Sequence, residues 1–355
     1  MYFDDKSILI TGGTGSLGKT LVDRILSGEL GTPRKVIVFS RDEAKQHDMR
    51  VAYHNKTVTT DEVIYNNFKN VLEFRIGDVR DYGDVCSALR DANIVVNAAA
   101  LKQVPTCEYF PMQAVMTNIT GASNIVRAIE EHGYRVETVV GISTDKACKP
   151  VNVMGMTKSV QERIFNSANV LIKNTRFICV RYGNVLASRG SVIPLFRHQI
   201  RQGGPVTITV PEMTRFLLSL NQAVDTVFEA LQYANPGETY VPNAPASTIS
   251  NIAKALIGDR AVDIHTLGIR PGEKMHEIMV SEEEANHTVA RGDYYAIKSM
   301  LPELNVGSEE PFSLNQAFSS ADNVLDYEGT CRLLREHDLL LTDEDRGGEE
   351  AELLR

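Results

Sequence analysis

A short polar segment, Ser143-Thr144-Asp145-Lys146, follows an apolar run and has the side chains for acid–base chemistry. It places a hydroxyl, a carboxyl group and an amine next to one another, and each of them can take or give a proton. Lys158 lies in a helical pattern over 153–168, at helical spacing from Met154, whose thioether can do neither. We therefore expect proton transfer at this segment. The alternative is that the segment is only a polar strand end and that Met154 is a core-facing helix residue.

A glycine-rich turn near the start of the chain predicts a dinucleotide site. The apolar run Ser7–Thr11 leads directly into the turn over 12–18, and a helical pattern follows. Glycines let the backbone of such a turn approach a pyrophosphate, and the amino terminus of the helix stabilises the phosphate charge. The alternative is a purely structural turn. The cofactor candidates in the turn are Gly12, Thr14, Gly15, Ser16, Leu17 and Gly18.

The end of the second apolar run favours NADP over NAD. Enzymes that prefer NAD usually end this strand with an acid that binds the ribose 2′-hydroxyl. Here the run ends Ser40-Arg41-Asp42, so a hydroxyl and a guanidinium are available for a 2′-phosphate. The alternative is that Asp42 binds the ribose and that Arg41 is only solvated.

Other cofactor candidates lie on or after the later strands. Asp78 and Val79 would flank the adenine, and small residues after the fourth strand would let the backbone pass close to the cofactor. These and the remaining candidates are Asp78, Val79, Ala98, Ala99, Ala100, Asn118, Lys158, Tyr182 and Asn184.

The elements that must position these residues alternate between strand and helix in the first half of the chain. Runs of Val and Ile without clean alternation predict strands buried on both faces, as in a parallel sheet. The predicted strands are Ser7–Thr11, Lys35–Ser40, Leu72–Ile76, Ile94–Ala98, Val136–Ser143 and Thr175–Val180. The predicted helices are Gly18–Ser27, Arg80–Arg90, Glu108–His132 and Val153–Ala168. This order predicts a doubly wound α/β fold with a parallel sheet of the Rossmann type.

The pattern changes after Asn184 to short pieces separated by Pro and Gly. We predict a Rossmann domain over 1–185, a smaller α+β substrate-binding domain over 186–300, and an arm with an acidic tail over 301–355. One helix near 217–235 should return to the first domain. The polar segment Tyr53–Asn70 should be an insertion loop.

The composition argues against several functions. The chain has 355 residues, 43% hydrophobic and 23% charged, as is ordinary for a globular protein. A net charge of -9 argues against a nucleic-acid partner but allows small phosphorylated ligands. The five cysteines have no metal-ligand spacing, so we expect no metal, and their odd number favours a reducing, cytoplasmic setting. No stretch approaches the roughly 20 apolar residues that a membrane span needs.

The chain resembles the extended short-chain dehydrogenases that act on nucleotide sugars, and within them the UDP-N-acetylglucosamine 4,6-dehydratases of surface-polysaccharide pathways. The densest match is Ser143-Thr144-Asp145-Lys146-Ala147 with Pro150, Asn152, Met154, Gly155 and Lys158. Other matching segments, within residues 5–300, are Phe39–Glu43, Ala98–Pro105, Arg181–Val185, Ser188–Pro194, Met213–Phe216 and Arg270–Lys274. Met154 stands where many of these enzymes have a tyrosine, which points to the methionine subgroup.

The resemblance implies an internal redox cycle with NADP and UDP-N-acetylglucosamine. In that family, hydride leaves carbon 4 of the sugar, the carbon 5 proton is removed, water is lost from carbon 6, and the hydride returns to carbon 6. The resemblance makes Lys146 the base and Asp145 the acid, while Thr144 bonds the carbon 4 hydroxyl and Lys158 binds the nicotinamide ribose. These roles require a lowered pKa for Lys146 and a pKa raised by burial for Asp145.

Members that also invert carbon 5 match best, and inversion would need a proton donor on the opposite face of the sugar. Lys102 and Cys107 are candidates, although Cys107 can equally be a buried structural thiol. Arg189, Arg215 and Arg270 are candidates for the UDP phosphates, because the guanidinium suits phosphate, and each can equally be a surface charge. The remaining substrate candidates are Lys102, Asn184, Ser191, Val192 and Glu273.

The resemblance also implies a homo-oligomer, often a hexamer in this family. Two other functions stay open at this point. A carbon 4 epimerase would have to work without the tyrosine on which such enzymes rely. A redox sensor would bind NADP(H) without turnover, and it would have no need for Asp145, Lys146 and Lys158.

Overall fold

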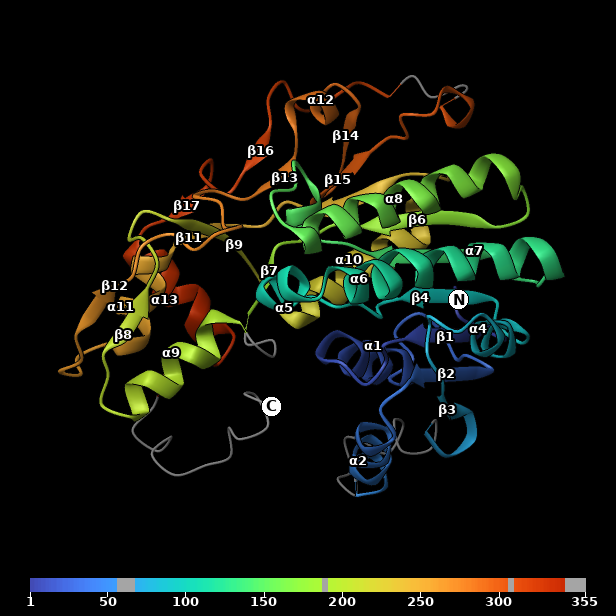
Figure 1. Cartoon of the computed structure of the whole chain (residues 1–355), viewed down its shortest axis with the longest axis horizontal. Helices are drawn as coiled ribbons and strands as arrows, with labels where there is room; N and C mark the ends of the chain where they lie inside the picture. Colours follow the sequence, from blue (N-terminus) through green and yellow to red (C-terminus); the bar gives the residue numbers. More distant parts are fainter. Residues whose placement is uncertain (56–67, 187–190, 306–309, 342–355) are drawn as a thin grey trace.

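A computed structural model describes residues 1–55, 68–186, 191–305 and 310–341 (Figure 1). Its largest element is a nine-stranded sheet in the order β14-β15-β10-β6-β5-β4-β1-β2-β3. The first six strands are β1 (Ser7–Thr11), β2 (Lys35–Ser40), β3 (Leu72–Ile76), β4 (Ile94–Asn97), β5 (Thr138–Ile142) and β6 (Arg176–Val180). The other three are β10 (Thr239–Pro242), β14 (Thr288–Arg291) and β15 (Tyr294–Ile297). All neighbours from β3 to β10 are parallel, and β15 pairs antiparallel with β10 and with β14.

Helices cover both faces of this sheet, because successive strand residues point to opposite faces. In β1, Ile8 and Ile10 join a core with α1 and α10, whereas Leu9 joins a core with α4, α7 and α8. The helices are α1 (Ser16–Leu26), α4 (Tyr82–Leu89), α7 (Gly121–His132), α8 (Val153–Leu171) and α10 (Leu220–Tyr233). Figure 1 shows α7 and α8 lying side by side on their face. The predicted doubly wound Rossmann fold is confirmed.

Two predicted features of the first half were wrong. The single helix expected over Glu108–His132 is broken into α5 (Val104–Tyr109), α6 (Pro111–Ala114), a π-helical turn η2 (Val115–Thr120) and α7. Pro111 explains the break, because it has no N–H to donate to the preceding turn. A helix that was not predicted, α2 (Glu43–His54), overlaps the start of the expected insertion loop. Most of that loop, residues 56–67, lies outside the described residues.

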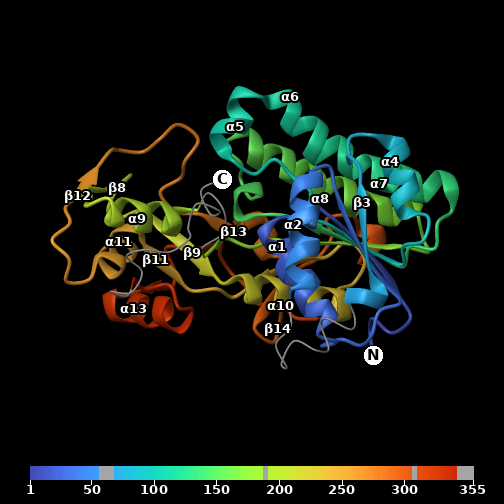
Figure 2. The same cartoon turned by 90° about the horizontal axis from the view of Figure 1, so that it is seen from below.

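From Asn184 onward, the segments outside α10, β10, β14 and β15 mostly build a smaller unit beside the main sheet, seen on one side of Figure 2. Its sheets have the orders β17-β11-β9-β7 and β12-β8. Its strands are β7 (Asn184–Val185), β8 (Val206–Ile208), β9 (Thr214–Leu218), β11 (Ala246–Thr248), β12 (Ile264–Thr266) and β17 (Val324–Leu325). Its helices are α9 (Val192–Arg201), α11 (Ile249–Ile257) and α13 (Tyr327–Glu336), which share one apolar core.

The remaining elements connect the two units. An antiparallel pair, β13 (Ile278–Val280) and β16 (Phe318–Ser319), lies near the short helices η3 (Asp145–Ala147) and α12 (Glu282–Ala285), and η4 (Pro302–Leu304) follows β15. The helix expected near 217–235 is α10, which packs on α1, β6 and β10. The division of the chain at residues 185 and 300 stays a prediction. In the described parts of the chain, no helix is both long and apolar enough to cross a bilayer.

Candidate active site

The turn between β1 and α1 has the shape that a dinucleotide pyrophosphate requires. Gly12 has φ +67°, and a Cβ on it would come within 2.8 Å of the backbone of Ala99. A Cβ on Gly18 would come within 2.5 Å of Gly13, so helix and turn pack backbone to backbone. Gly15 precedes the first turn of α1, where the free N–H groups point out of the helix. Side chains at Gly12 or Gly18 would collide with the neighbouring backbone. Because these residues are glycines, the turn stays open and fits a phosphate group.

At the end of β2, the Arg41 side chain is exposed, whereas the Asp42 side chain is used within the fold. Asp42 caps α2: its carboxylate accepts the Lys45 backbone N–H at 3.1 Å and pairs with the Lys45 ammonium at 2.7 Å. Ser40 lies 3.0 Å, hydroxyl to hydroxyl, from Thr14 of the glycine-rich turn. The Arg41 side chain is 58% exposed, with its guanidinium 3.8 Å from Asp78. The side chains at this strand end therefore include an exposed cation, while the neighbouring acid is used as a helix cap.

The other cofactor candidates near the sheet have mainly backbone or packing contacts. Asp78 accepts bonds from Arg80; partial burial would raise the pKa of Asp78, but these bonds outweigh it and lower that pKa. Val79 is buried against Gly121. Ala98, Ala99 and Ala100 follow β4 and are half-buried, and the Ala99 N–H donates to Thr11.

Asn118 is fully buried and fixes the chain after β4. Its amide donates to the Leu101 carbonyl at 3.0 Å and to the Thr157 hydroxyl at 2.9 Å, and it accepts the Leu101 N–H at 2.8 Å. These bonds tie η2 to α8 across the loop. Asn118 therefore supports the site through the loop that carries Leu101 and Lys102.

The polar segment after β5 forms a compact hydrogen-bonded group. The Thr144 hydroxyl donates to Asp145 Oδ1 at 2.9 Å, and Lys146 Nζ donates to the same oxygen at 3.1 Å. Asp145 is fully buried. Gly155 allows this arrangement, because a Cβ there would collide with the Lys146 carbonyl oxygen. The segment η3 therefore lies directly on the first turn of α8.

Lys146 also contacts two residues from distant parts of the chain. Its Nζ lies 3.3 Å from Glu277 Oε1 and donates to Asn184 Oδ1 at 3.4 Å. Glu277 in turn lies 4.0 Å from Arg215 Nε. The sequence prediction missed Glu277, although an acid between the matched segment Arg270–Lys274 and an apolar strand was a usable signal.

The expected lowering of the Lys146 pKa was wrong for this arrangement. Burial acts to lower that pKa, and the charge of Arg215 adds to this effect. The carboxylates of Asp145 and Glu277 outweigh both, so the pKa of Lys146 lies above its ordinary value.

Lys158, in contrast to Lys146, has a lowered pKa. It is buried, and its Nζ donates to the Ile142 carbonyl at 2.8 Å and to Gln161 Oε1 at 2.9 Å. Burial lowers the pKa of Lys158 to about 8. Both hydrogen-bond acceptors of this amine are neutral, so burial outweighs the attraction of the Glu162 carboxylate.

Met154 faces an apolar cluster with Cys107 and Ala114. Cys107 is fully buried, its thiol donates to the Leu101 carbonyl at 3.7 Å, and burial raises the pKa of that thiol. This geometry favours the structural interpretation of Cys107 over a proton donor. Lys102 is exposed on the same loop. Tyr182 is buried, and its carbonyl accepts the Asp145 N–H at 3.1 Å.

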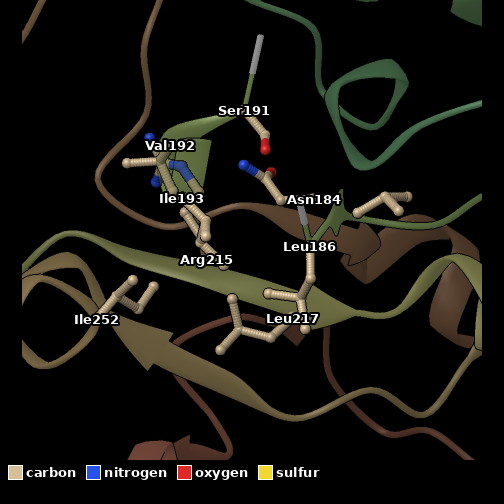
Figure 3. Close-up of a pocket in the computed structure, with 9 residues that line it drawn as sticks. Asn184, Leu186, Ser191, Val192, Ile193, Arg215, Leu217 and Ile252 are labelled. Atoms are coloured by element: carbon tan, nitrogen blue, oxygen red, sulfur yellow. The ribbon is translucent and has the colours of Figure 1, made fainter. Parts of the chain in front are cut away.

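Several substrate candidates line one narrow pocket, where β7, the start of α9, β9 and α11 approach one another (Figure 3). Figure 3 shows the Ser191 hydroxyl and the Asn184 amide turned toward the same space. Ser191 precedes α9, and within the described chain its buried hydroxyl oxygen has no hydrogen-bond partner. The pocket is lined by Asn184, Val185, Leu186, Ser191, Val192, Ile193, Arg215, Leu217 and Ile252.

Two further substrate candidates lie on a turn beside α8. The Glu273 N–H donates to the Arg270 carbonyl at 3.2 Å, and Arg270 is exposed. The Gly272 carbonyl between them accepts the Asn152 amide at 2.8 Å, so the turn is fixed to the start of α8. Arg189 lies outside the described residues.

Comparison with known proteins places this arrangement in a family. A family described as polysaccharide biosynthesis protein matches residues 8–299. A curated protein, UDP-glucose 4-epimerase of Rickettsia bellii (strain OSU 85-389), is 44% identical over 328 residues, covering 90% of this chain and 92% of the relative.

Solved structures share the fold. The X-ray structure of Pen from Bacillus thuringiensis superposes with a TM-score of 0.85 at 33% identity, covering 96% of this chain and all of that one. DesIV, a dTDP-glucose 4,6-dehydratase from Streptomyces venezuelae solved with NAD and TYD, has a TM-score of 0.65 at 17% identity, covering 94% and 97%. At that identity, DesIV supports the fold alone, the extended short-chain dehydrogenase fold. Since the family match spans most of the chain and the Rickettsia relative aligns over nearly all of it, the chain belongs to the polysaccharide biosynthesis protein family.

Proposed function

We propose that this protein is an NADP-dependent UDP-N-acetylglucosamine 4,6-dehydratase that produces a 4-keto-6-deoxy sugar nucleotide for a surface glycan. The observation that carries the proposal is the 3.1 Å contact between the buried Asp145 and the partly buried Lys146, beside a helix that carries Met154 and Lys158. An acid and an amine in contact can divide the removal of a proton and the departure of water between them.

The pair must exchange one proton before it can act. The charged pair has a protonated Lys146 and an ionised Asp145, whereas dehydration needs a neutral amine and a neutral acid. Transfer of the proton from Lys146 to Asp145 produces both. Lys146 then takes the proton of carbon 5, Asp145 gives its proton to the departing carbon 6 hydroxyl, and the charged pair is restored.

Thr144 and Lys158 support the first step. The Thr144 hydroxyl, which is bonded to Asp145, can hydrogen-bond the carbon 4 hydroxyl while the proton of that hydroxyl leaves to solvent. An equivalent proton is taken up at carbon 5 when the hydride returns to carbon 6. Lys158 would hold the nicotinamide ribose, where its charge lowers the barrier electrostatically. The bound dinucleotide would supply reversible hydride transfer.

NADP is the proposed dinucleotide because of the end of β2. The exposed Arg41 cation and the Ser40 hydroxyl suit a 2′-phosphate, and Asp42 is used to cap α2. The turn over 12–18 would hold the pyrophosphate.

The pocket beside α9 is the proposed site of the UDP diphosphate. The amino end of α9 offers free N–H groups, Ser191 offers a hydroxyl, and Arg215 offers a buried cation. Arg270 and Glu273 on the neighbouring turn, and Arg189 and Lys102, are proposed to bind the rest of the nucleotide sugar.

A UDP-sugar 4-epimerase is the second candidate, because the Rickettsia bellii relative carries that name. An epimerase returns hydride to carbon 4 and needs one group that takes and returns the carbon 4 hydroxyl proton. Met154 cannot do so, and its side chain faces an apolar cluster. Dehydration, which uses an acid and a base together, is therefore the better match to these residues.

Incubation with UDP-N-acetylglucosamine and NADP+ separates the two candidates. Dehydration lowers the mass of the sugar nucleotide by one water, whereas epimerisation leaves it unchanged. Running the reaction in heavy water with NMR of the product reports exchange at carbon 5 and whether that carbon is inverted. A product of unchanged mass with inverted carbon 4 would establish the epimerase instead.

We also propose that the protein is a homo-oligomer. Large apolar side chains are exposed on or next to α5, α6, η2 and α8, which are neighbours in the fold. A contiguous exposed apolar patch is typical of a protein interface. The exposed side chains are Tyr109, Phe110, Met112, Met116, Val151, Met156 and Val160.

A further inference from the structure

Glu277 is a buried carboxylate beside the candidate active site that the proposed chemistry does not use. Its side chain is 3% exposed, one of its oxygens lies 3.3 Å from Lys146 Nζ, and the same oxygen lies 4.0 Å from Arg215 Nε. Its other oxygen is buried without a hydrogen-bond partner in the described part of the chain. A buried carboxylate is costly unless it is paired, so these two cations account for its charge.

The backbone of Glu277 is fixed independently of Lys146. Its N–H donates to the Ser320 hydroxyl at 2.9 Å, and its carbonyl accepts the Ser320 N–H at 2.8 Å. Ser320 is bonded in turn to the Thr214 hydroxyl at 2.7 Å, next to Arg215 on β9. The backbone that carries this carboxylate is therefore anchored at the end of the paired strands β13 and β16, while the long Lys146 side chain is the adaptable partner.

The charges around Lys146 come from three elements. Asp145 belongs to η3 with Lys146 itself, Arg215 comes from β9, and Glu277 precedes β13. From β7, Asn184 adds a neutral acceptor, and α8 contributes backbone contact at Gly155. Two carboxylates thus balance two cations, and removal of either carboxylate leaves an uncompensated positive charge.

We propose that Glu277 is a positioning residue of the candidate active site: its anchored carboxylate holds the Lys146 ammonium beside Asp145 and sets the pH at which that lysine becomes a base. The inference rests on the proposed function for its catalytic meaning. The contact between Glu277 and Lys146 can be tested without it.

Glu277→Gln removes the charge and keeps the shape of the side chain. The test is competitive labelling of the full-length protein with acetic anhydride across pH, followed by peptide mass spectrometry, because only neutral amines react. We expect the labelling midpoint of Lys146 to fall by about 1 pH unit or more, the effect typical of losing an opposite charge at this distance. An unchanged midpoint in folded Glu277→Gln protein overturns the proposal.

Glu282→Gln is the matched control. Glu282 pairs with the nearby Lys149 on the exposed surface, so this variant should change the labelling of Lys149 and leave Lys146 as in the wild type. A fall of the Lys146 midpoint in this control would also overturn the proposal, because it would show a nonspecific response to lost charge.

Glu277→Asp keeps the test decisive if Glu277→Gln does not fold, and a double-mutant cycle adds a second test if Glu277→Gln folds but is destabilised. Glu277→Asp retains the charge and should keep most of the wild-type midpoint. In a double-mutant cycle with Lys146→Met, the unfolding free energies of Glu277→Gln and Lys146→Met should be non-additive, with the double variant more stable than the sum predicts. Additive effects, or a Glu277→Asp midpoint as low as that of a neutral variant, contradict the proposal.

Activity gives the catalytic readout. If the wild type dehydrates UDP-N-acetylglucosamine, the acidic limb of the kcat profile should move to lower pH in Glu277→Gln and return toward its place in Glu277→Asp. If the wild type forms no dehydrated product, the proposed function fails, while the labelling result still decides the role of Glu277 toward Lys146.

Discussion

The Lys146 carbonyl packs directly against the Cα of Gly155, at the point where η3 meets the first turn of α8. Glycine is required there because any Cβ would collide with the carbonyl oxygen. This contact fixes the backbone of the proposed base against the helix that carries Met154 and Lys158. The contact therefore holds two sequence segments, η3 and the start of α8, together in one rigid site.

We predict that Gly155→Ala separates η3 from α8. The unfolding free energy should fall by about 2 kcal/mol, the cost typical of overpacking, and dehydratase activity should fall further than stability explains. Ser167→Ala, at an exposed position of the same helix, is the control and should leave both unchanged. Chemical denaturation and the mass assay measure the two effects, and wild-type activity in Gly155→Ala would show that this contact does not position Lys146.

Arg41 should determine the preference for NADP. Loss of a charged contact to the 2′-phosphate costs about 1.5–3 kcal/mol, so Arg41→Ala should weaken NADP binding roughly tenfold or more and leave NAD binding nearly unchanged. Titration calorimetry with both dinucleotides measures this, and Arg50→Ala on α2 controls for general loss of positive charge.

Asp42→Ala tests the other interpretation of the same strand end. It should lower stability by about 1 kcal/mol through loss of the α2 cap and should not change the ratio of the two affinities. A selective loss of NAD binding in this variant would mean that Asp42 binds the ribose.

Strands β1, β2 and β3 begin and end where they were expected. In β1 and β2 the reason is nearly continuous burial, which gives an apolar run, whereas β3 at the sheet edge is only partly buried and includes Glu73 and Arg75. Helix α2 was missed because its sequence is mostly polar and only Gln46, Met49 and Tyr53 are buried. Such a helix is stabilised by its Asp42 cap and a few contacts, which periodicity does not reveal.

Contacts within the site could be predicted from spacing only where residues are neighbours in sequence, although the family resemblance also supplied distant candidates such as Asn184 and Arg215. Thr144, Asp145 and Lys146 are adjacent, so their contact follows from one segment. Glu277 and Asn184 reach Lys146 only through tertiary structure, and with Glu277 comes the second negative charge that reverses the expected direction of the Lys146 pKa. A pKa depends on all the charges that surround a group, which a local segment does not contain.

Lys158 should make stability rise at alkaline pH. Burial lowers its pKa to about 8 in the folded protein, against about 10.5 in the unfolded chain. Between these values the unfolded chain binds more protons, so the unfolding free energy increases with pH there, by up to about 3 kcal/mol from this residue. Below about pH 8 the Lys158 amine is charged in both the folded and the unfolded state, so the folded protein is destabilised by the full cost of burying that charge.

The check is the difference between wild type and Lys158→Met, which cancels the titration of other groups. The stability advantage of Lys158→Met should be greatest below about pH 8 and should shrink toward about pH 10.5. Urea denaturation at several pH values measures it. A difference independent of pH would mean that Lys158 keeps an ordinary pKa in the folded protein.

The exposed apolar side chains on α6 and α8 should lie in a subunit interface. Met112→Glu and Met156→Glu each place a charge in that face, so the assembly should dissociate toward monomers in sedimentation velocity experiments. Leu267→Glu changes a comparably exposed apolar residue elsewhere and should not alter the sedimentation coefficient. If the wild type already sediments as a monomer, the proposed oligomer is wrong.

Lys146→Ala gives the most direct test of the proposed chemistry. Loss of a positioned general base typically lowers the rate about 10²–10⁴-fold, so dehydration of UDP-N-acetylglucosamine should become nearly undetectable. Cofactor affinity should stay close to that of the wild type, because the glycine-rich turn and the end of β2 are separate from η3. Lys149→Ala removes a neighbouring lysine whose partners are Glu282 and Glu283 on the surface, and it should retain activity. Dehydrated product at the wild-type rate from Lys146→Ala would show that another group removes the carbon 5 proton, and Lys158, the buried amine with the lower pKa, would then be the residue to test.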